Sequence, residues 1–151
     1  LLRRVKNLLQ TRPYTEQKLR EKLKEGYYSE SVIDEAIAYV KSFHYVDDYD
    51  YACQYIFYHK ENEPRKKMEE KLLQKGVLKD VLDKAMEVEY HTSEEQMEAE
   101  YRQAQKLLEK KNYDSENMDW KEKQKIYAFL MRKGFSYEDI RQVIQVSGWN
   151  A

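Results

Sequence analysis

Apolar residues recur along most of the chain at the spacing of amphipathic helices. Three pairs lie four positions apart: Leu19 with Leu23, Met68 with Leu72, and Ile126 with Leu130. Side chains four residues apart share one face of a helix, so each pair predicts a helix with a buried face. After a short polar stretch, a second apolar stripe includes Ile33, Leu82 or Ile140. The pattern therefore predicts three pairs of helices, each joined by a short connection.

The same motif spans the connection in each pair. In its clearest copy, Leu130 is followed by Gly134, Phe135 and Ile140, and two earlier copies run from Leu72 to Leu82 and, less regularly, from Leu23 to Ile33. The copies are offset by 49 residues (23 to 72) and by 58 residues (72 to 130), which leaves nine extra residues that we place in a loop at 112–118. Repeats of this length are supersecondary units.

The connections have the residues of a helix stop followed by a helix start. Gly76 and Gly134 are suited to the left-handed conformation that ends a helix, and Ser29 and Ser136 are typical caps of the helix that follows. The first copy differs, because Tyr27 occupies the position that glycine holds in the other two. Its turn geometry stays open.

These signals predict an all-α protein of three tandem three-helix repeats, at residues 1–46, 47–92 and 93–151. The chain has two Pro and four Gly in 151 residues, which leaves little room for strands and hairpins. Its runs of Glu, Lys, Gln, Leu and Ala favour helix. Stacked helical repeats form an elongated, curved module with a concave surface, and we expect that shape here.

Composition limits the classes of function. A charged fraction of 36% and a mean hydropathy of −1.00 favour several thin cores over one deep core. The net charge of −1 argues against a protein that coats nucleic acid by bulk charge, although local basic faces are compatible with it. Cys53 is the one cysteine and excludes an internal disulfide. No segment resembles a signal or a membrane span, so we expect a cytoplasmic protein, and the start at Leu1 without Met suggests that an N-terminal part is missing.

No constellation of residues indicates catalysis. His44, His59 and His91 lie far apart without metal-ligand spacing, and there is neither a nucleophile with an evident base nor a glycine-rich phosphate loop. We therefore expect no enzyme activity, cofactor or metal. The fourteen tyrosines are unusual; we expect Tyr39, Tyr51, Tyr55 and Tyr127 to fill the thin cores, with a recognition surface as the alternative.

An ordered series of short motifs resembles the RecX family along nearly the whole chain. It consists of Arg12-Pro13-Tyr14-Thr15-Glu16, Lys18-Leu19-Arg20, Lys22-Leu23, Val46-Asp47-Asp48, Tyr51-Ala52, Leu72-Leu73-Gln74-Lys75-Gly76-Val77, Lys125-Ile126, Leu130 and Arg132-Lys133-Gly134-Phe135-Ser136-Tyr137. Two positions depart from the family pattern: Cys53 replaces an Arg, and Tyr27 replaces a Gly. Family contacts at these two positions are not carried over.

The resemblance implies a regulator. RecX proteins are tandem three-helix repeats that bind the filament of the RecA recombinase along its groove and restrain its ATPase and strand-exchange activities in recombination, DNA repair and the SOS response. We therefore expect the RecA filament as partner, with auxiliary contact to single-stranded DNA, no membrane and a monomeric state.

A row of lysines provides candidate partner-binding residues. Lys18, Lys67 and Lys125 recur at one repeat position, and the full candidate set is Lys18, Arg65, Lys66, Lys67, Lys121, Lys123, Lys125, Arg132 and Lys133. Such a row can meet phosphates, meet acidic groups on a protein filament, or be a solvated helix face. The alternative function is a tandem helix-turn-helix protein that binds nucleic acid, because two helices joined by a tight turn also outline that motif. A plain scaffold repeat is the third interpretation.

Overall fold

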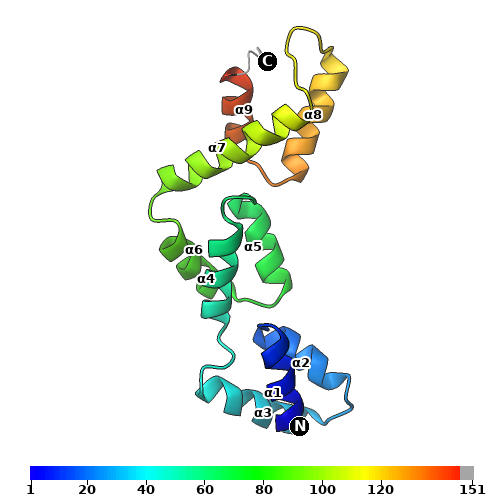
Figure 1. Cartoon of the computed structure of the whole chain (residues 1–151), viewed down its shortest axis with the longest axis vertical. Coiled ribbons are helices and arrows are strands. Elements are labelled where there is room, and N and C mark those ends of the chain that lie inside the picture. The colour runs from blue at the N-terminus through cyan, green and yellow to red at the C-terminus, as the bar shows by residue number, and fades with distance from the viewer. Residues whose placement is uncertain (147–151) are drawn as a thin grey trace. The chain divides into compact units, whose positions relative to one another are not determined.

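The computed structural model describes residues 1–146, with side chains through residue 144 (Figure 1). Within these residues the chain is helical and has no strand, which confirms the predicted all-α class. Residues 147–151, the end of the predicted third repeat, lie outside the described residues. The helices are α1 (Leu2–Thr11), α2 (Glu16–Lys24), α3 (Glu30–Ser42), α4 (Asp48–His59), α5 (Arg65–Gln74), α6 (Lys79–Glu89), α7 (Ser93–Lys110), α8 (Trp120–Arg132) and α9 (Tyr137–Val146).

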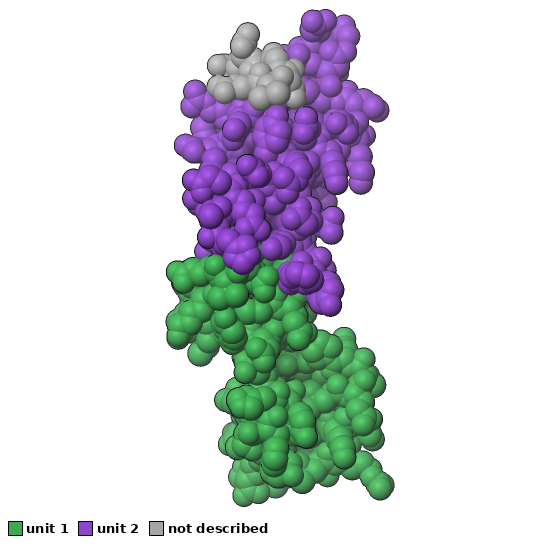
Figure 2. Space-filling model, turned by 60° about the vertical axis from the view of Figure 1, so that its left-hand side comes forward, with its two compact units in different colours: residues 1–56, 71–89 green, residues 57–70, 90–151 purple. Residues whose placement is uncertain are grey.

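The chain forms two compact units whose boundaries do not coincide with the predicted repeats. Unit 1 contains residues 1–56 and 71–89, and unit 2 contains residues 57–70 and 90–151 (Figure 2). The division passes through α4 and α5, so the predicted middle repeat contributes to both units. The repeat boundaries at 46 and 92 stay predictions.

The N-terminal helices of unit 1 surround a small apolar core, with α2 packed on α3. The helices begin where the sequence predicts, because the hydroxyls of Thr15 and Ser29 accept hydrogen bonds from the amides of Lys18 and Val32. Burying one Leu or Ile side chain contributes roughly 1.5–3 kcal/mol. The buried side chains include Val5, Leu19, Leu23, Ile33, Ile37, Val40 and Val46.

In unit 2, α7 lies along α9, and α9 also contacts α8. The predicted cap Ser136 accepts a hydrogen bond from the amide of Asp139 at 3.1 Å. The connection between α7 and α8 spans residues 111–119, which is four residues more than the connection between α4 and α5 at 60–64. Since α7 is also six residues longer than α4, the prediction that the loop holds all the extra residues was wrong. The core contains Ala104, Leu108, Ile126, Leu130, Phe135, Ile140, Val143 and Ile144.

The predicted left-handed turns are present. Gly76 and Gly134 have φ of 93° and 100°. At both, the turn residue and its successor donate hydrogen bonds back into the preceding helix, as in the amides of Gly76 to Leu73 and of Val77 to Leu72. Tyr27 adopts the same conformation, with φ of 61°, and 97% of its surface is exposed. The first copy therefore keeps the turn with a residue that is strained in it.

Close packing gives a second reason for glycine at position 76. A Cβ atom on Gly76 would lie 2.5 Å from the Cβ atom of Gln17, at the start of α2. Beside it, the Thr15 hydroxyl donates a 2.6 Å hydrogen bond to the carbonyl of Lys75. The N-terminus of α2 thus rests on the turn between α5 and α6. We call this contact the first junction.

Unit 2 contains an equivalent contact between α5 and the turn from α8 to α9. A Cβ atom on Gly134 would lie 3.2 Å from Pro64 Cγ and from Lys67 Cβ, and Lys67 Nζ donates to the carbonyl of Arg132 at 3.4 Å. Pro64 and Thr15 are separated by 49 residues, the offset of the first two repeats. This second junction therefore uses the repeat positions of the first.

A carboxylate from the first helix of the next predicted repeat completes each junction. The amide of Glu16, the first residue of α2, donates to Asp48 Oδ1 of α4 at 2.9 Å. The amide of Arg65, the first residue of α5, donates to Glu100 Oε1 of α7 at 2.9 Å. Both amides belong to the group of helix-start donors that find no acceptor within their own helix.

We expect Tyr27→Gly to stabilise the protein. Glycine adopts positive φ without the steric cost that tyrosine has there, and the exposed ring contributes little packing. The gain should be about 0.5–1 kcal/mol, measured as a higher midpoint of urea unfolding. Tyr27→Ala is the matched control, since it removes the ring but keeps Cβ, and it should give no comparable gain. Equal gains from both variants would contradict the assignment of strain to φ.

A double-mutant cycle tests the close approach at the first junction. Gly76→Ala should cost about 1–3 kcal/mol, because the new methyl is strained at positive φ and overlaps Gln17. Gln17→Ala alone should change stability by less than about 0.5 kcal/mol, since its side chain is exposed. In the double variant the overlap with the side-chain amide of Gln17 should disappear, whereas the overlap with the Cβ atom, which alanine keeps, should remain. Strictly additive effects would show that the side-chain amide of Gln17 does not meet the new methyl.

Candidate functional site

The second junction contains a buried carboxyl group with several partners. Glu100 of α7 accepts hydrogen bonds at Oε1 from the Arg65 amide at 2.9 Å and from Gln96 Nε2 at 3.3 Å. Its carboxyl group also shares a hydrogen bond with Asp139 of α9, which is buried as well. Burial, followed by this hydrogen bond, raises the pKa of Glu100 to about 8. Near neutral pH Glu100 is therefore largely protonated.

The side chain of Arg65 is held by neighbours in the same unit. Its Nε donates to Glu69 Oε1 at 2.8 Å, and its Nη1 donates to Gln96 Oε1 at 3.2 Å. The backbone amide of Arg65 is meanwhile bound to Glu100. Arg65 is one of the predicted partner-binding residues, but its guanidinium group and its backbone amide both form hydrogen bonds at the second junction.

A groove of about 630 Å³ lies beside this junction. Cationic Arg65, Lys66 and Arg141 line it together with acidic Glu69 and Glu138. Because both signs of charge line the groove, its electrostatics favour neither an anionic nor a cationic ligand. Within residues 1–146, no group of three or more His, Cys, Asp or Glu side chains is arranged to hold a metal ion.

The structure divides the predicted basic residues between the two units. Lys18 belongs to unit 1 and pairs with Glu21 at 3.2 Å. The other eight belong to unit 2, where Lys67 contacts the Arg132 carbonyl and also lies 3.8 Å from Glu70. Lys66 is exposed on α5. The fold therefore brings the start of α5 to the end of α8, as part of the second junction.

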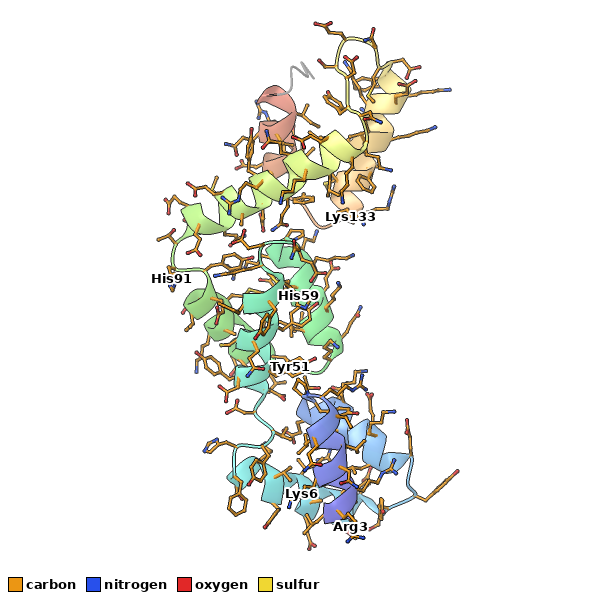
Figure 3. All side chains as sticks on the ribbon, viewed as in Figure 1. Arg3, Lys6, Tyr51, His59, His91 and Lys133 are labelled. Carbon is orange, nitrogen blue, oxygen red and sulfur yellow. The ribbon has the colours of Figure 1, made fainter. Side chains whose placement is uncertain are left out.

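Helical geometry selects among the predicted lysines of α8. Lys121 and Lys125 are one helical turn apart and are followed at the same spacing by Phe129 and Lys133, so these four residues follow one face. Lys123 lies two residues from either lysine and therefore on another side of the helix. We call Lys121, Lys125, Phe129 and Lys133 the α8 basic stripe; Figure 3 labels Lys133 at its end.

The ammonium groups of two lysines lie near the Phe129 ring at the end of this stripe. Lys111 Nζ lies 4.4 Å from the centre of the Phe129 ring, and Lys133 Nζ lies 5.5 Å from it. Cations at this distance are attracted to the face of an aromatic ring. Sequence reasoning missed Lys111, because only the fold brings the end of α7 to Phe129. Interleaved lysines and an aromatic ring suit an acidic or phosphate-bearing partner.

The tyrosines differ from the prediction at one position. Tyr39 does not fill a core, because 51% of its surface is exposed, whereas Tyr51, Tyr55 and Tyr127 are half-buried. Tyr39 falls on the outer side of α3, since the inward stripe is occupied by Ile33, Ala36, Ile37 and Val40. The expectation for Tyr39 was therefore wrong, and an exposed aromatic surface becomes a candidate for recognition.

Comparisons with known proteins agree on one family. A family model described as the first three-helix domain of RecX matches residues 2–39, and one described as the third three-helix domain matches residues 98–144. The regulatory protein RecX of Clostridium botulinum strain Eklund 17B is 33% identical over 131 residues, which cover 87% of this chain and 60% of the relative. That of Caldanaerobacter subterraneus is 29% identical and covers 93% of this chain and 66% of the relative.

A solved structure agrees over almost the full chain. The crystal structure of RecX from Lactobacillus salivarius matches with a TM-score of 0.76 and 26% identity, covering 97% of this chain and 93% of that one. The present chain spans about 60% of the length of its clostridial relatives. No described helix is both long enough and apolar enough to cross a membrane.

The buried carboxyl of Glu100 predicts how stability depends on pH. The folded chain keeps this proton up to a pKa of about 8, whereas the unfolded chain releases it near the ordinary value of 4.5. The folded state therefore binds more protons between these values, and this contribution to stability is complete below about pH 4.5 and is lost as the pH rises towards 8. The slope is at most about 1.4 kcal/mol per pH unit.

Glu100→Gln isolates this contribution, because glutamine mimics the protonated acid and does not titrate. Urea unfolding of both chains from about pH 5 to about pH 8.5 should show the unmodified protein losing stability relative to the variant as the pH rises. A difference between the chains that stays constant with pH would contradict the protonation of Glu100.

Proposed function

Because this chain belongs to the RecX family, we propose that it binds the nucleoprotein filament of the RecA recombinase and restrains the ATPase and strand-exchange activities of that filament. Its relatives are named regulatory proteins, which supports a regulatory role. The action is non-catalytic, requires no cofactor, and takes place in the cytoplasm during recombination and DNA repair. The chain acts as a monomer.

The observation that carries this proposal is the repetition of the junctions. The first and second junctions use equivalent helix starts and turns: Glu16 and Arg65 are 49 residues apart, and Gly76 and Gly134 are 58 residues apart. A protein built from equivalent repeats presents equivalent surfaces in series, and a helical filament presents equivalent neighbours in series. Weak contacts made several times over add up to firm binding. An elongated, curved module, as the repeats predict, suits such a groove.

The α8 basic stripe supplies the chemistry of one contact. Lys121, Lys125 and Lys133 can pair with acidic side chains on the recombinase, and Phe129 with Lys111 can approach the DNA strand within the filament. The net charge of −1 disfavours strong binding to free nucleic acid. Contact with single-stranded DNA is thus auxiliary to the protein contact.

Co-sedimentation tests the proposal directly. The chain is mixed with RecA filaments assembled on single-stranded DNA and, in parallel, with the same DNA alone. Preferential sedimentation with the filament is the expected result, together with slower DNA-dependent ATP hydrolysis. Equal binding to naked DNA would instead favour the tandem helix-turn-helix alternative, and binding to neither would contradict both functions.

Charge reversal of Lys66 and Lys125 tests the basic surface. Both residues are exposed, whereas Lys67 contacts Arg132 and would disturb the second junction if changed. Each single change to Glu should weaken inhibition of ATP hydrolysis by about fivefold at most, because one exposed ion pair contributes up to about 1 kcal/mol. The double change should weaken it by more than either single change, up to about 25-fold if the two contacts are independent.

The matched control is the pair Lys6→Glu and Lys84→Glu, which makes the same change of net charge on exposed positions of α1 and α6. This control should inhibit almost as well as the unmodified chain. Circular dichroism should show unchanged helical content in all variants. If the test pair still inhibits fully, the basic surface is only a solvated helix face.

A further inference from the structure

Three exposed aromatic side chains form a connected cluster in unit 1. Tyr39, Phe43 and Tyr45 are exposed by 51%, 53% and 66%. The ring centres of Tyr39 and Phe43 are 5.1 Å apart, and those of Phe43 and Tyr45 are 5.8 Å apart with nearly parallel planes. Contiguous apolar surface of this kind is uncommon on a folded protein unless it meets a partner. We call these residues the aromatic cluster.

The backbone holds the cluster in place. Tyr39 lies on α3 and Phe43, four residues later, is the C-cap residue of that helix. The amide of Tyr45 donates to the carbonyl of Val40 at 3.0 Å. Between them, His44 adopts the left-handed conformation with φ of 59°, where glycine would be favoured. Val46 then returns to the core. The rings are thus ordered before any partner arrives, which lowers the entropic cost of binding.

His44 has a strained backbone conformation at the end of α3. The left-handed turns after α5 and α8 use Gly76 and Gly134, whereas the left-handed turn after α3 uses a histidine whose side chain is exposed. Strain of about 1 kcal/mol at an exposed turn is typical of functional surfaces. Its structural effect here is to turn Tyr45 back onto Phe43.

The charges around the cluster specify the partner. Glu35 precedes Tyr39 by one helical turn, and Asp47 lies two residues after Tyr45, 3.9 Å from the His44 ring. Lys41, which lies between Tyr39 and Phe43 in the sequence, is bound to Glu16 at 2.9 Å. Asp47 Oδ1 also accepts a hydrogen bond from the Asp50 amide at 3.1 Å, whereas Glu35 is exposed. Aromatic faces and carboxylates attract cations and repel phosphates. Arginine suits them best, because its planar guanidinium stacks on rings and pairs with carboxylates.

From these observations we infer that the aromatic cluster docks an arginine-bearing surface of a protein partner. The inference rests on the proposed function, in which that partner is the recombinase protein within the filament. The chain then contacts the filament through two surfaces of opposite character: the α8 basic stripe meets acidic groups and phosphates, and the aromatic cluster meets arginine on the protein.

The test compares a ring-removing variant with a ring-retaining one. The first carries Tyr39→Ser, Phe43→Ser and Tyr45→Ser; the second carries Tyr39→Phe and Tyr45→Phe, which remove only hydroxyl groups. Binding to RecA filaments on single-stranded DNA is measured by co-sedimentation. The ring-removing variant should lose about tenfold or more in affinity, as expected for aromatic anchors, while the ring-retaining variant binds normally. Circular dichroism establishes that both remain helical, and Phe43→Ala alone provides a milder change.

A second pair of substitutions tests the charge of the partner. Glu35→Gln and Asp47→Asn keep size and hydrogen bonding but remove the two carboxylates, so affinity should fall several-fold. The aromatic variants should leave the slope of affinity against salt concentration almost unchanged, whereas Lys66→Glu with Lys125→Glu should reduce that slope.

The outcomes separate the two proposals. If the unmodified chain does not sediment with filaments, the proposed function is wrong. If it does, and the ring-removing variant binds equally well, only the aromatic inference is overturned. Loss of naked-DNA binding in the ring-removing variant would identify a base-stacking surface and overturn the protein assignment. Unchanged binding after removal of the carboxylates would overturn the assignment of arginine.

Discussion

The first backbone amides of α2 and α5 need acceptors from outside their own helices, and the rest of the architecture depends on how they obtain them. Asp48 accepts from Glu16, and Glu100 accepts from Arg65. A carboxylate is well suited to this position, because the start of a helix carries partial positive charge. The second helix of each of these repeats is therefore completed by the first helix of the next predicted repeat. This explains why the compact units cross the boundaries that the sequence suggests.

The two junctions share this geometry but differ in electrostatics. Asp48 is half-buried, and burial raises its pKa although the hydrogen bond from the Glu16 amide opposes the change. Glu100 is buried more deeply and faces a second carboxyl group, that of Asp139, so one proton is retained between the two. The carboxyl pKa is thus raised at both junctions, and at the second one it reaches about 8.

Helices, caps and turns could be predicted from the sequence because they depend on neighbours close along the chain. The spacing of Leu19 and Leu23, the cap at Ser136 and the turns at Gly76 and Gly134 all follow from local rules. The junction carboxylates could not be predicted for two reasons. Asp48 and Glu100 are 52 residues apart, an interval that matches neither repeat offset, and the chain has 28 acidic residues from which to choose. The candidate surface was predicted in part: Lys121, Lys125 and Lys133 share a face, Lys123 does not, and Lys111 joins them only in three dimensions.

Because each repeat finishes the one before it, the number of repeats is a property that evolution and protein engineering can change only in certain ways. A chain that ended near residue 46 would lack the acceptor Asp48 and the turn on which Thr15 rests. A chain that ended near residue 92 would lack the acceptor Glu100 and the turn that Pro64 contacts. Exchange of repeats between relatives would need to carry the acceptor and the glycine together, because a junction that lacks either one is incomplete.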